Sequence, residues 1–151
     1  MSSKDKNSAK ILIVEDNPGD ILLIQEVLGE SEGHFNLSIT KDGAEAMDYL
    51  VNKRQEYPLN LPDAVILDLN LPKKNGREIL ANIRSDEKLK ELPVIIFTSS
   101  DAEEDIMICQ YLNVIKYYKK PIDFDEYVNT IKAIEKSIEN IIESKNNSII
   151  H

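Results

Sequence analysis

The stretch VILDLNLPKKNG, residues 65–76, runs from three apolar residues directly into the carboxylate of Asp68. Burying an ionised carboxylate without a partner is costly, so Asp68 must cap a turn, bind a ligand or react. An isolated aspartate at the end of a strand is most simply a turn residue, because aspartate favours turns. The rest of the chain has to decide between these alternatives.

Further short apolar runs occur along the chain, and each is followed by a segment whose apolar residues have helical spacing. The predicted strands are ILIV (11–14), FNLSI (35–39), AVIL (64–67), VIIF (94–97) and IKYY (115–118). The predicted helices span about residues 18–28, 44–52, 76–85, 102–112 and 123–144. Strand–helix repeats of this kind predict an α/β fold with a parallel sheet and right-handed crossovers.

The strands differ in their hydrophobic pattern. Four are continuous apolar or aromatic runs, as is typical of strands covered on both faces, whereas residues 35–39 alternate between apolar and polar like an edge strand. We expect one domain over residues 9–144, with residues 1–8 and 145–151 as flexible tails.

Composition excludes several classes of protein. The net charge of -9 argues against a nucleic-acid-binding surface, which would be basic. No apolar run approaches the roughly 18 residues of a membrane span, and the polar start MSSKDKNSAK does not match a signal peptide. A single cysteine, Cys109, cannot form an internal disulfide. We therefore expect a cytoplasmic protein that does not bind nucleic acid or membrane.

Polar residues collect where the predicted strands end. These residues are Glu15 and Asp16, Asp68, Thr98, and Lys119 and Lys120. Each has a purely structural explanation, because acids and hydroxyls favour helix caps and turns and lysines favour the surface. In an open parallel sheet, however, ligands bind beyond the carboxyl ends of the strands. Their shared position at one edge therefore predicts a binding or catalytic site.

The residue types at this edge suit phosphoryl transfer. The carboxylates of Glu15, Asp16 and Asp68 would repel one another without a cation among them, and hard oxygen ligands suit Mg²⁺. Asp68 would be the nucleophile, because a carboxylate can form an acyl phosphate. Lys120 would supply a positive charge, and Thr98 a hydroxyl donor, for the phosphoryl oxygens.

Over about residues 9–144 the chain resembles the receiver domain of two-component response regulators. The segments that carry the resemblance are ILIVEDNPGDILLIQEVL, VILDLNLPKKNG, VIIFTSS and YYKKP. Each motif alone is weak, but four in this order and at these spacings are specific. The resemblance implies a flavodoxin-like (βα)5 fold, in which a doubly wound five-stranded parallel sheet of order 2-1-3-4-5 lies between two layers of helices.

The resemblance also implies a function for the site. A sensor or hybrid histidine kinase would transfer a phosphoryl group to Asp68. The transfer would need Mg²⁺, held by Glu15, Asp16, Asp68 and the backbone carbonyl of Asn70. Such a protein is a signalling phosphoacceptor that assists its own phosphorylation and dephosphorylation, and it is not a conventional enzyme.

Further roles follow from the same resemblance. Thr98 and Tyr117 would form the switch that responds to phosphorylation. Lys119 is the alternative to Lys120 as the lysine of the site, and Lys120 is preferred because it directly precedes Pro121.

The family pattern also draws attention to three polar positions. The side chains of Asn70 and Ser100 would border the path of the water that hydrolyses the acyl phosphate. Asn113 would take a left-handed turn conformation where relatives carry glycine.

Three other functions fit the sequence less well. A phosphatase of the haloacid-dehalogenase type would carry a second acid at the position of Asn70, whose amide cannot donate a proton as a carboxylic acid does. A flavodoxin-like cofactor binder would need a hydroxyl- and glycine-rich loop where the chain reads EDNPGD. A pseudo-receiver that acts by contact alone would not need the complete pocket.

Within the family, DLNLPKKNGREIL and TSSDAEEDI look most like the stand-alone regulators of phytochrome-type and related hybrid histidine kinases. No output domain is visible in the sequence, so we expect signalling through a downstream protein whose identity the sequence does not indicate.

The last predicted helix is long, so we expect Ile138, Ile141 and Ile142 to project beyond the sheet. Two alternatives for burying them stay open. They fold back onto the N-terminal segment, or they lie in a symmetric homodimer formed by the fourth and fifth helices and the fifth strand.

Overall fold

A single parallel sheet organises the protein. The computed structural model describes residues 8–29, 35–57 and 60–150. In the described chain the strands are β1 (Ala9–Val14), β2 (Phe35–Thr40), β3 (Ala64–Leu67), β4 (Val94–Thr98) and β5 (Lys116–Lys119). All pairings are parallel, in the order β2-β1-β3-β4-β5. The predicted flavodoxin-like fold and its strand order are therefore confirmed.

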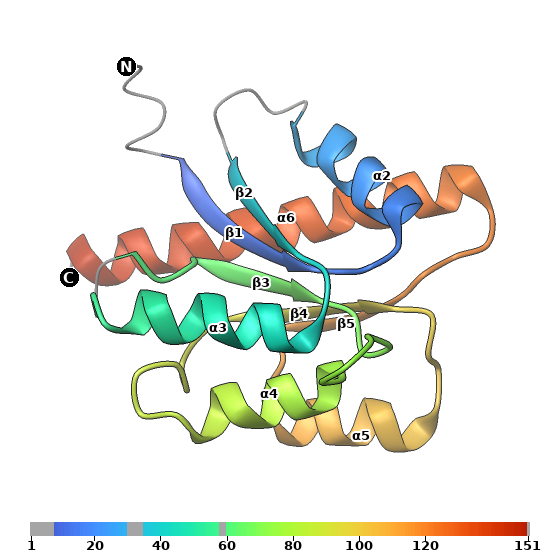
Figure 1. Cartoon of the computed structure of the whole chain (residues 1–151). Helices are drawn as coiled ribbons and strands as arrows, with labels where there is room; N and C mark the ends of the chain where they lie inside the picture. Colours follow the sequence, from blue (N-terminus) through green and yellow to red (C-terminus); the bar gives the residue numbers. More distant parts are fainter. Residues whose placement is uncertain (1–7, 30–34, 58–59, 151) are drawn as a thin grey trace.

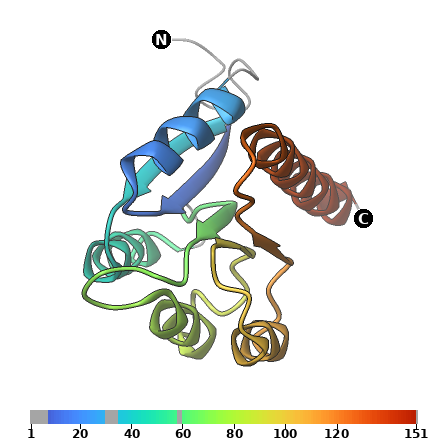
Figure 2. The ribbon, with the colours of Figure 1, turned by 90° about the vertical axis from the view of Figure 1, so that its right-hand side faces the viewer.

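Helices cover both faces of this sheet. They are α2 (Pro18–Gly29), α3 (Gly43–Arg54), α4 (Gly76–Ser85), α5 (Glu103–Tyr111) and α6 (Phe124–Ile150). Helices α2 and α6 lie on one face, and α3, α4 and α5 lie on the other (Figures 1 and 2). The result is the expected three-layer α/β/α arrangement.

The central strands are apolar throughout because alternate residues serve two separate cores. In β1, Ile11 and Ile13 pack in the core beneath α2 and α6, whereas Leu12 and Val14 pack in the core beneath α3, α4 and α5. The same alternation runs along β3 and β4. Each of these strands needs apolar residues at every position, since its side chains alternate between two buried faces.

Strand β5 is an edge of the sheet, as the expected strand order implies, and its Lys116 and Lys119 are exposed. Tyr117 and Tyr118 are half-buried and pack against opposite cores. Aromatic rings can pack with one end while the hydroxyl reaches a polar partner, which explains why an aromatic run can form an edge.

Helices α3 and α4 begin at side-chain caps. Asp42 accepts a hydrogen bond from the backbone N–H of Glu45 at the start of α3 (2.8 Å). Asn75 accepts one from the N–H of Arg77 at the start of α4 (2.9 Å). After α5, Asn113 has a φ of 57°, so the predicted left-handed turn is confirmed. These caps place the first turns of α3 and α4 at the carboxyl edge of the sheet.

Helix α6 differs from the sequence prediction in two ways. Ile138 does not project beyond the sheet but is fully buried, and Ile141 and Ile142 pack beside it against a core that includes Ala9 of β1. The helix also continues through residues 145–150, which we expected to be a flexible tail. KNNSII contains neither glycine nor proline, so nothing in it ends the helix.

Helix α6 packs against α2 as well as against the sheet, so the strand length alone does not limit how much of its apolar stripe is buried. At its far end Lys145 contacts Asp63 (3.2 Å), just before β3. No helix in the described ranges combines the length and apolar character needed to cross a bilayer.

Candidate phosphoryl-transfer site

Three carboxylates converge at the carboxyl edge of the sheet. Glu15 and Asp16 follow β1, and Asp68 follows β3, its neighbour in the sheet. One oxygen from each lies within 4.8 Å of the others. Glu15 and Asp68 are buried while Asp16 is exposed, so the cluster is open to solvent on one side. Such a set of oxygen ligands fits a hard divalent cation that keeps part of its water shell.

Both oxygens of Asp68 accept hydrogen bonds from specific donors. The buried Thr98 hydroxyl donates to Oδ1 (2.7 Å), and Lys120 Nζ donates to Oδ2 (2.9 Å). The backbone N–H of Asn70 also donates to Oδ1 (3.0 Å). Asp68 is only 5% exposed. A carboxylate can be tolerated at this depth because three donors, one of them charged, satisfy it.

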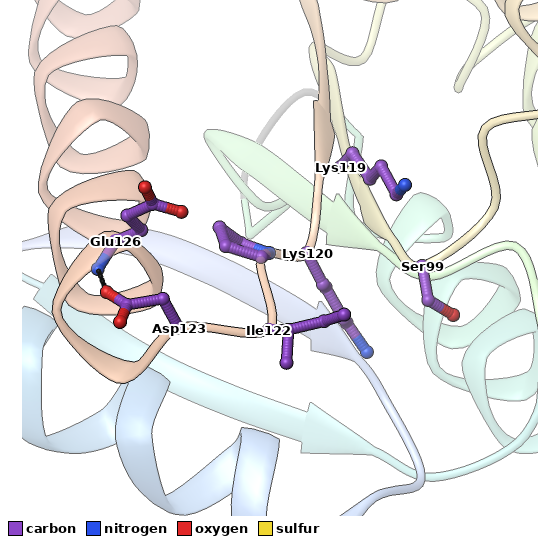
Figure 3. A pocket seen from close by; sticks show the side chains of 7 residues that line it. Ser99, Lys119, Lys120, Ile122, Asp123 and Glu126 are labelled. Carbon is purple, nitrogen blue, oxygen red and sulfur yellow. Dashed lines mark hydrogen bonds between the residues drawn. The ribbon is translucent and has the colours of Figure 1, made fainter.

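Lys120, and not Lys119, is the lysine beside Asp68. Its Nζ also donates to Glu15 (2.7 Å) and Asp20 (2.8 Å), and its side chain is 10% exposed. Lys119 points to a different side, as Figure 3 shows, and pairs at the surface with Asp101 (2.9 Å). Successive side chains of a strand point to opposite faces, so only one of two consecutive lysines can reach the site.

Burial and charge shift the pKa values of the groups in this cluster. Burial raises the pKa of Glu15 to about 7, although the hydrogen bond and charge of Lys120 oppose the shift, and the negative charge of Asp68 adds to it. Burial alone would lower the pKa of Lys120, but hydrogen bonds to Asp20 and Glu15 and attraction to Glu15 and Asp68 hold it above its usual value. Lys120 is therefore a permanent positive charge among these acids.

Asp20 is a member of the site that sequence reasoning missed. It lies in the first turn of α2, where an acid is explained well enough by the helix dipole. In the structure one of its oxygens accepts from Lys120, and the other accepts a short hydrogen bond from the Tyr127 hydroxyl of α6. The available signal was Tyr127 itself, because a tyrosine on a buried helical stripe needs a partner for its hydroxyl.

The predicted switch residue Tyr117 lies outside this carboxylate cluster. It is half-buried, and its hydroxyl donates to the backbone carbonyl of Ser100 (2.7 Å). Burial raises the pKa of this hydroxyl. The N–H of Ser100 in turn donates to the Thr98 hydroxyl at 3.4 Å. Tyr117 is thus connected to Asp68 through the loop that follows β4.

A second set of contacts missed in the sequence joins α4 to α5. Arg77 makes two hydrogen bonds to the buried carboxylate of Asp105 (2.6 and 2.7 Å), which hold the pKa of Asp105 below its usual value. Arg77 also donates to the carbonyl of Leu69 (3.2 Å), next to Asp68. The hydroxyl of the half-buried Ser100 donates to Asp105 (2.6 Å).

Gly76, the first residue of α4, lies directly against the backbone of Asp68. A Cβ atom at this position would be 2.2 Å from the Asp68 carbonyl oxygen and 2.6 Å from Leu69 Cα. The N–H of Gly76 donates to the Leu69 carbonyl (3.1 Å). The glycine that ends the VILDLNLPKKNG stretch is therefore needed because the helix and the loop after β3 approach so closely.

A cavity opens beside Lys120, on the loop between β5 and α6. The residues that line it are Ser99, Lys119, Lys120, Pro121, Ile122, Asp123 and Glu126, and Figure 3 shows them. Ile122 is fully exposed, and Asp123 accepts a hydrogen bond from the N–H of Glu126 (2.9 Å) at the start of α6. An accessible and partly apolar cavity therefore lies next to the acidic cluster.

Comparison with known proteins identifies the family. A family model described as the response regulator receiver domain matches residues 11–132. The chain belongs to this family. As a receiver domain it is a signalling protein, which agrees with the resemblance seen in its sequence.

Several phytochrome-associated regulators are similar to this receiver domain. Response regulator Rcp1 of Synechocystis sp. is 37% identical over 135 residues, covering 89% of this chain and 92% of that protein. The solved structure of the phosphorylated cyanobacterial phytochrome response regulator RcpA is 42% identical, with a TM-score of 0.78, and the match covers 85% of this chain and 92% of that one.

One solved structure bears on the acidic cluster. It is the Mn²⁺-bound form of Rcp1, which is 38% identical to this receiver, has a TM-score of 0.76 and is matched over 84% of this chain and 91% of that one. The cluster of Glu15, Asp16 and Asp68 is suited to a divalent ion of the same kind.

Proposed function

We propose that this receiver accepts a phosphoryl group on Asp68 from a sensor or hybrid histidine kinase and signals through a change at Thr98 and Tyr117. The observation that carries the proposal is the environment of Asp68. Its carboxylate lies within reach of two other acids while Thr98 and Lys120 donate to its two oxygens. The similarity to phytochrome response regulators supports a kinase of that class as the donor.

In the transfer, one oxygen of Asp68 forms a new bond to phosphorus while the bond between phosphorus and the histidine nitrogen breaks. The nitrogen keeps the electron pair and is neutralised by a proton. With acetyl phosphate as donor, acetate leaves and no proton is needed. Lys120 Nζ and the Thr98 hydroxyl lie 2.9 and 2.7 Å from the Asp68 oxygens, close enough to turn towards phosphoryl oxygens at the same place.

A Mg²⁺ ion would neutralise charge on the phosphoryl group as it is transferred. Glu15, Asp16, Asp68 and the backbone carbonyl of Asn70 would hold it. The first three are supported by their convergence within 4.8 Å. Asn70 is supported by its position two residues after Asp68, where its N–H already donates to the Asp68 carboxylate. The exposed side of the cluster, at Asp16, leaves room for the ion's waters.

The switch would work by competition for the Thr98 hydroxyl. That hydroxyl donates to Asp68 in the present state, and a phosphoryl oxygen would draw it further out of the sheet. The loop of Ser100 is bonded to both Thr98 and Tyr117, so movement of Thr98 would loosen the Tyr117 contact and bias the ring inward.

One experiment tests both parts. Incubation of ¹⁵N-labelled protein with Mg²⁺ and acetyl phosphate should add the mass of one phosphoryl group, in an adduct that hydroxylamine removes as expected for an acyl phosphate. Chelation of the metal should abolish the addition. NMR shifts should then extend from Asp68 to Tyr117. Absence of the adduct would refute phosphorylation, and shifts confined to the residues around Asp68 would refute the switch.

The partner surface is proposed to be the face of α5, β5 and α6. Large apolar side chains are exposed there at Met107, Ile108, Tyr111 and Ile115. Ile108 is 44% exposed, whereas Asp105 of the same helix is buried. Apolar groups gathered on one face indicate a protein partner, and the acidic composition argues against nucleic acid.

The same face is the proposed homodimer surface. The monomer buries Ile138, contrary to the expectation that it lies in a dimer interface, so the dimer is proposed on the exposed side chains of α5. Sedimentation equilibrium, with and without acetyl phosphate, should show a dimer that Tyr111→Lys disrupts and Tyr57→Lys, at an exposed tyrosine elsewhere, does not. A wild type that stays monomeric in both states would contradict the dimer.

A further inference from the structure

The ammonium group of Lys120 is fully engaged. It has three protons, and three different carboxylates accept from it: Glu15 at 2.7 Å, Asp20 at 2.8 Å and Asp68 at 2.9 Å. To bind a phosphoryl oxygen, the lysine must release at least one of these acceptors. The question is which carboxylate keeps it in place when that happens.

Glu15 and Asp68 both have other tasks in the proposed function. Their oxygens belong to the convergent cluster that would bind the metal, and Asp68 would also carry the phosphoryl group. Asp20 is not part of that cluster in the described chain. It is therefore the acceptor that can stay with Lys120 from the free state through phosphorylation.

The carboxylate of Asp20 is itself held from two helices. Its backbone N–H donates to Asn17 Oδ1 (3.0 Å), which fixes it in the first turn of α2. The Tyr127 hydroxyl of α6 donates to the oxygen that Lys120 does not use. Tyr127 is 7% exposed, and its ring makes a T-shaped contact with the ring of Phe97, with the two centroids 5.2 Å apart. The lysine's own Nζ lies 5.8 Å from the centre of the Phe97 ring.

From this arrangement we infer that Asp20 is a positioning residue for phosphoryl transfer. Its carboxylate, oriented by Tyr127, keeps the ammonium of Lys120 aimed at Asp68 once Glu15 and Asp68 turn to the metal and the phosphoryl group. Asp20 touches neither of these, and it acts through the lysine. The inference rests on the proposed function and names a further residue of the same site.

Loss of this positioning has a distinct kinetic signature. Without Asp20, Lys120 is less well oriented but still carries its charge. The affinities for acetyl phosphate and for Mg²⁺ therefore change little. The ammonium group is then less well placed to stabilise the phosphoryl group during transfer. The maximal rate falls, because a small misplacement of a stabilising group can lower the reaction rate by one to two orders of magnitude. Asp20→Asn should therefore lower the rate at saturating acetyl phosphate and Mg²⁺ about tenfold.

The test compares three variants with wild type. Asp20→Asn removes the charged acceptor, Tyr127→Phe removes only the hydroxyl that orients it, and Glu26→Gln removes an exposed charge from the same helix α2. Asp20→Asn should show the tenfold loss in maximal rate, with half-saturating acetyl phosphate and Mg²⁺ affinity within about twofold of wild type. Tyr127→Phe should show a smaller loss in the same direction, and Glu26→Gln should match wild type.

A second readout needs neither metal nor phosphate. The side-chain ammonium signal of Lys120 in ¹H–¹⁵N spectra should be protected in wild type and in Glu26→Gln, and it should shift and exchange faster in Asp20→Asn. Unfolding by denaturant, measured on each variant, identifies a merely structural effect, because that would lower stability while leaving the maximal rate of the folded protein unchanged.

Three results would overturn the inference or its basis. A maximal rate for Asp20→Asn equal to that of Glu26→Gln would overturn it outright. A loss of Mg²⁺ affinity as large as that of Asp16→Asn would make Asp20 a metal ligand instead. A wild-type protein that takes up no phosphoryl group would overturn the proposed function, and that result is distinct from either of the others.

Discussion

Replacing Gly76 with alanine should lower the free energy of unfolding of this receiver by about 3 kcal/mol and displace Asp68. The added Cβ would lie 2.2 Å from the Asp68 carbonyl oxygen and 2.6 Å from Leu69 Cα. Both neighbours are backbone atoms, so no side-chain rotation relieves the clash. Either the start of α4 or the loop after β3 must shift, and that loop carries the proposed phosphoacceptor.

Gly29, the last residue of α2, provides the matched control. A Cβ there meets no atom within 4 Å, so Gly29→Ala should change stability by less than about 1 kcal/mol. Denaturant unfolding of both variants measures the difference. Acetyl phosphate labelling should also be impaired in Gly76→Ala at temperatures where the variant remains folded. Equal effects of the two substitutions on stability would show that the close approach at Gly76 is unimportant.

The second large effect is expected at Lys120. Lys120→Met leaves the carboxylates of Glu15, Asp20 and Asp68 without the cation that all three now contact. Removing one partner of a buried ion pair is strongly destabilising, and partial exposure of Asp20 reduces the cost here. We expect a loss of about 2 kcal/mol in the absence of divalent metal at neutral pH. Mg²⁺ should restore most of it, because the ion replaces the missing positive charge.

The pH range of that measurement follows from the direction of the pKa shift. The pKa of Lys120 is raised in the folded protein, so its contribution is fully present below the pKa of an unfolded lysine, about 10, and is lost as pH rises through the folded value. At neutral pH the lysine itself is therefore fully protonated.

Lys119→Met is the control for this substitution. Its partner Asp101 is exposed, and exposed ion pairs contribute less than about 1 kcal/mol. The variant should therefore resemble wild type in both stability and response to Mg²⁺. If Lys119→Met is as destabilised as Lys120→Met, or if Mg²⁺ stabilises Lys120→Met no more than wild type, the role of Lys120 as the counter-charge of the cluster is wrong.

Much of the fold could be predicted because it follows from local patterns. Continuous apolar runs such as AVIL (64–67) mark strands buried on both faces, and the predicted bounds of β3 and α4 match the structure. The rule that ligands bind beyond the carboxyl ends of parallel strands then drew attention to Glu15, Asp68, Thr98 and Lys120, and the structure brings these four side chains together.

The features that were missed depend on how separate helices pack. Asp20 meets Tyr127 from a different helix, and Arg77 meets Asp105 across the gap between α4 and α5. No periodicity within one helix reveals such pairs, because each residue has an adequate local explanation. The burial of Ile138 was missed for a related reason, since it depends on the packing of α6 against both α2 and the sheet.

The length of α6 gives the molecule a mechanical element. Near one end Tyr127 is bonded to Asp20 beside the phosphoacceptor, and towards the other end Lys145 contacts Asp63 below the opposite edge of the sheet. At 1.5 Å per residue these two contacts are about 27 Å apart along one rod. A tilt of about 5° at Tyr127 would displace Lys145 by about 2 Å. One continuous helix therefore connects the surroundings of the proposed phosphoacceptor to the amino edge of the sheet.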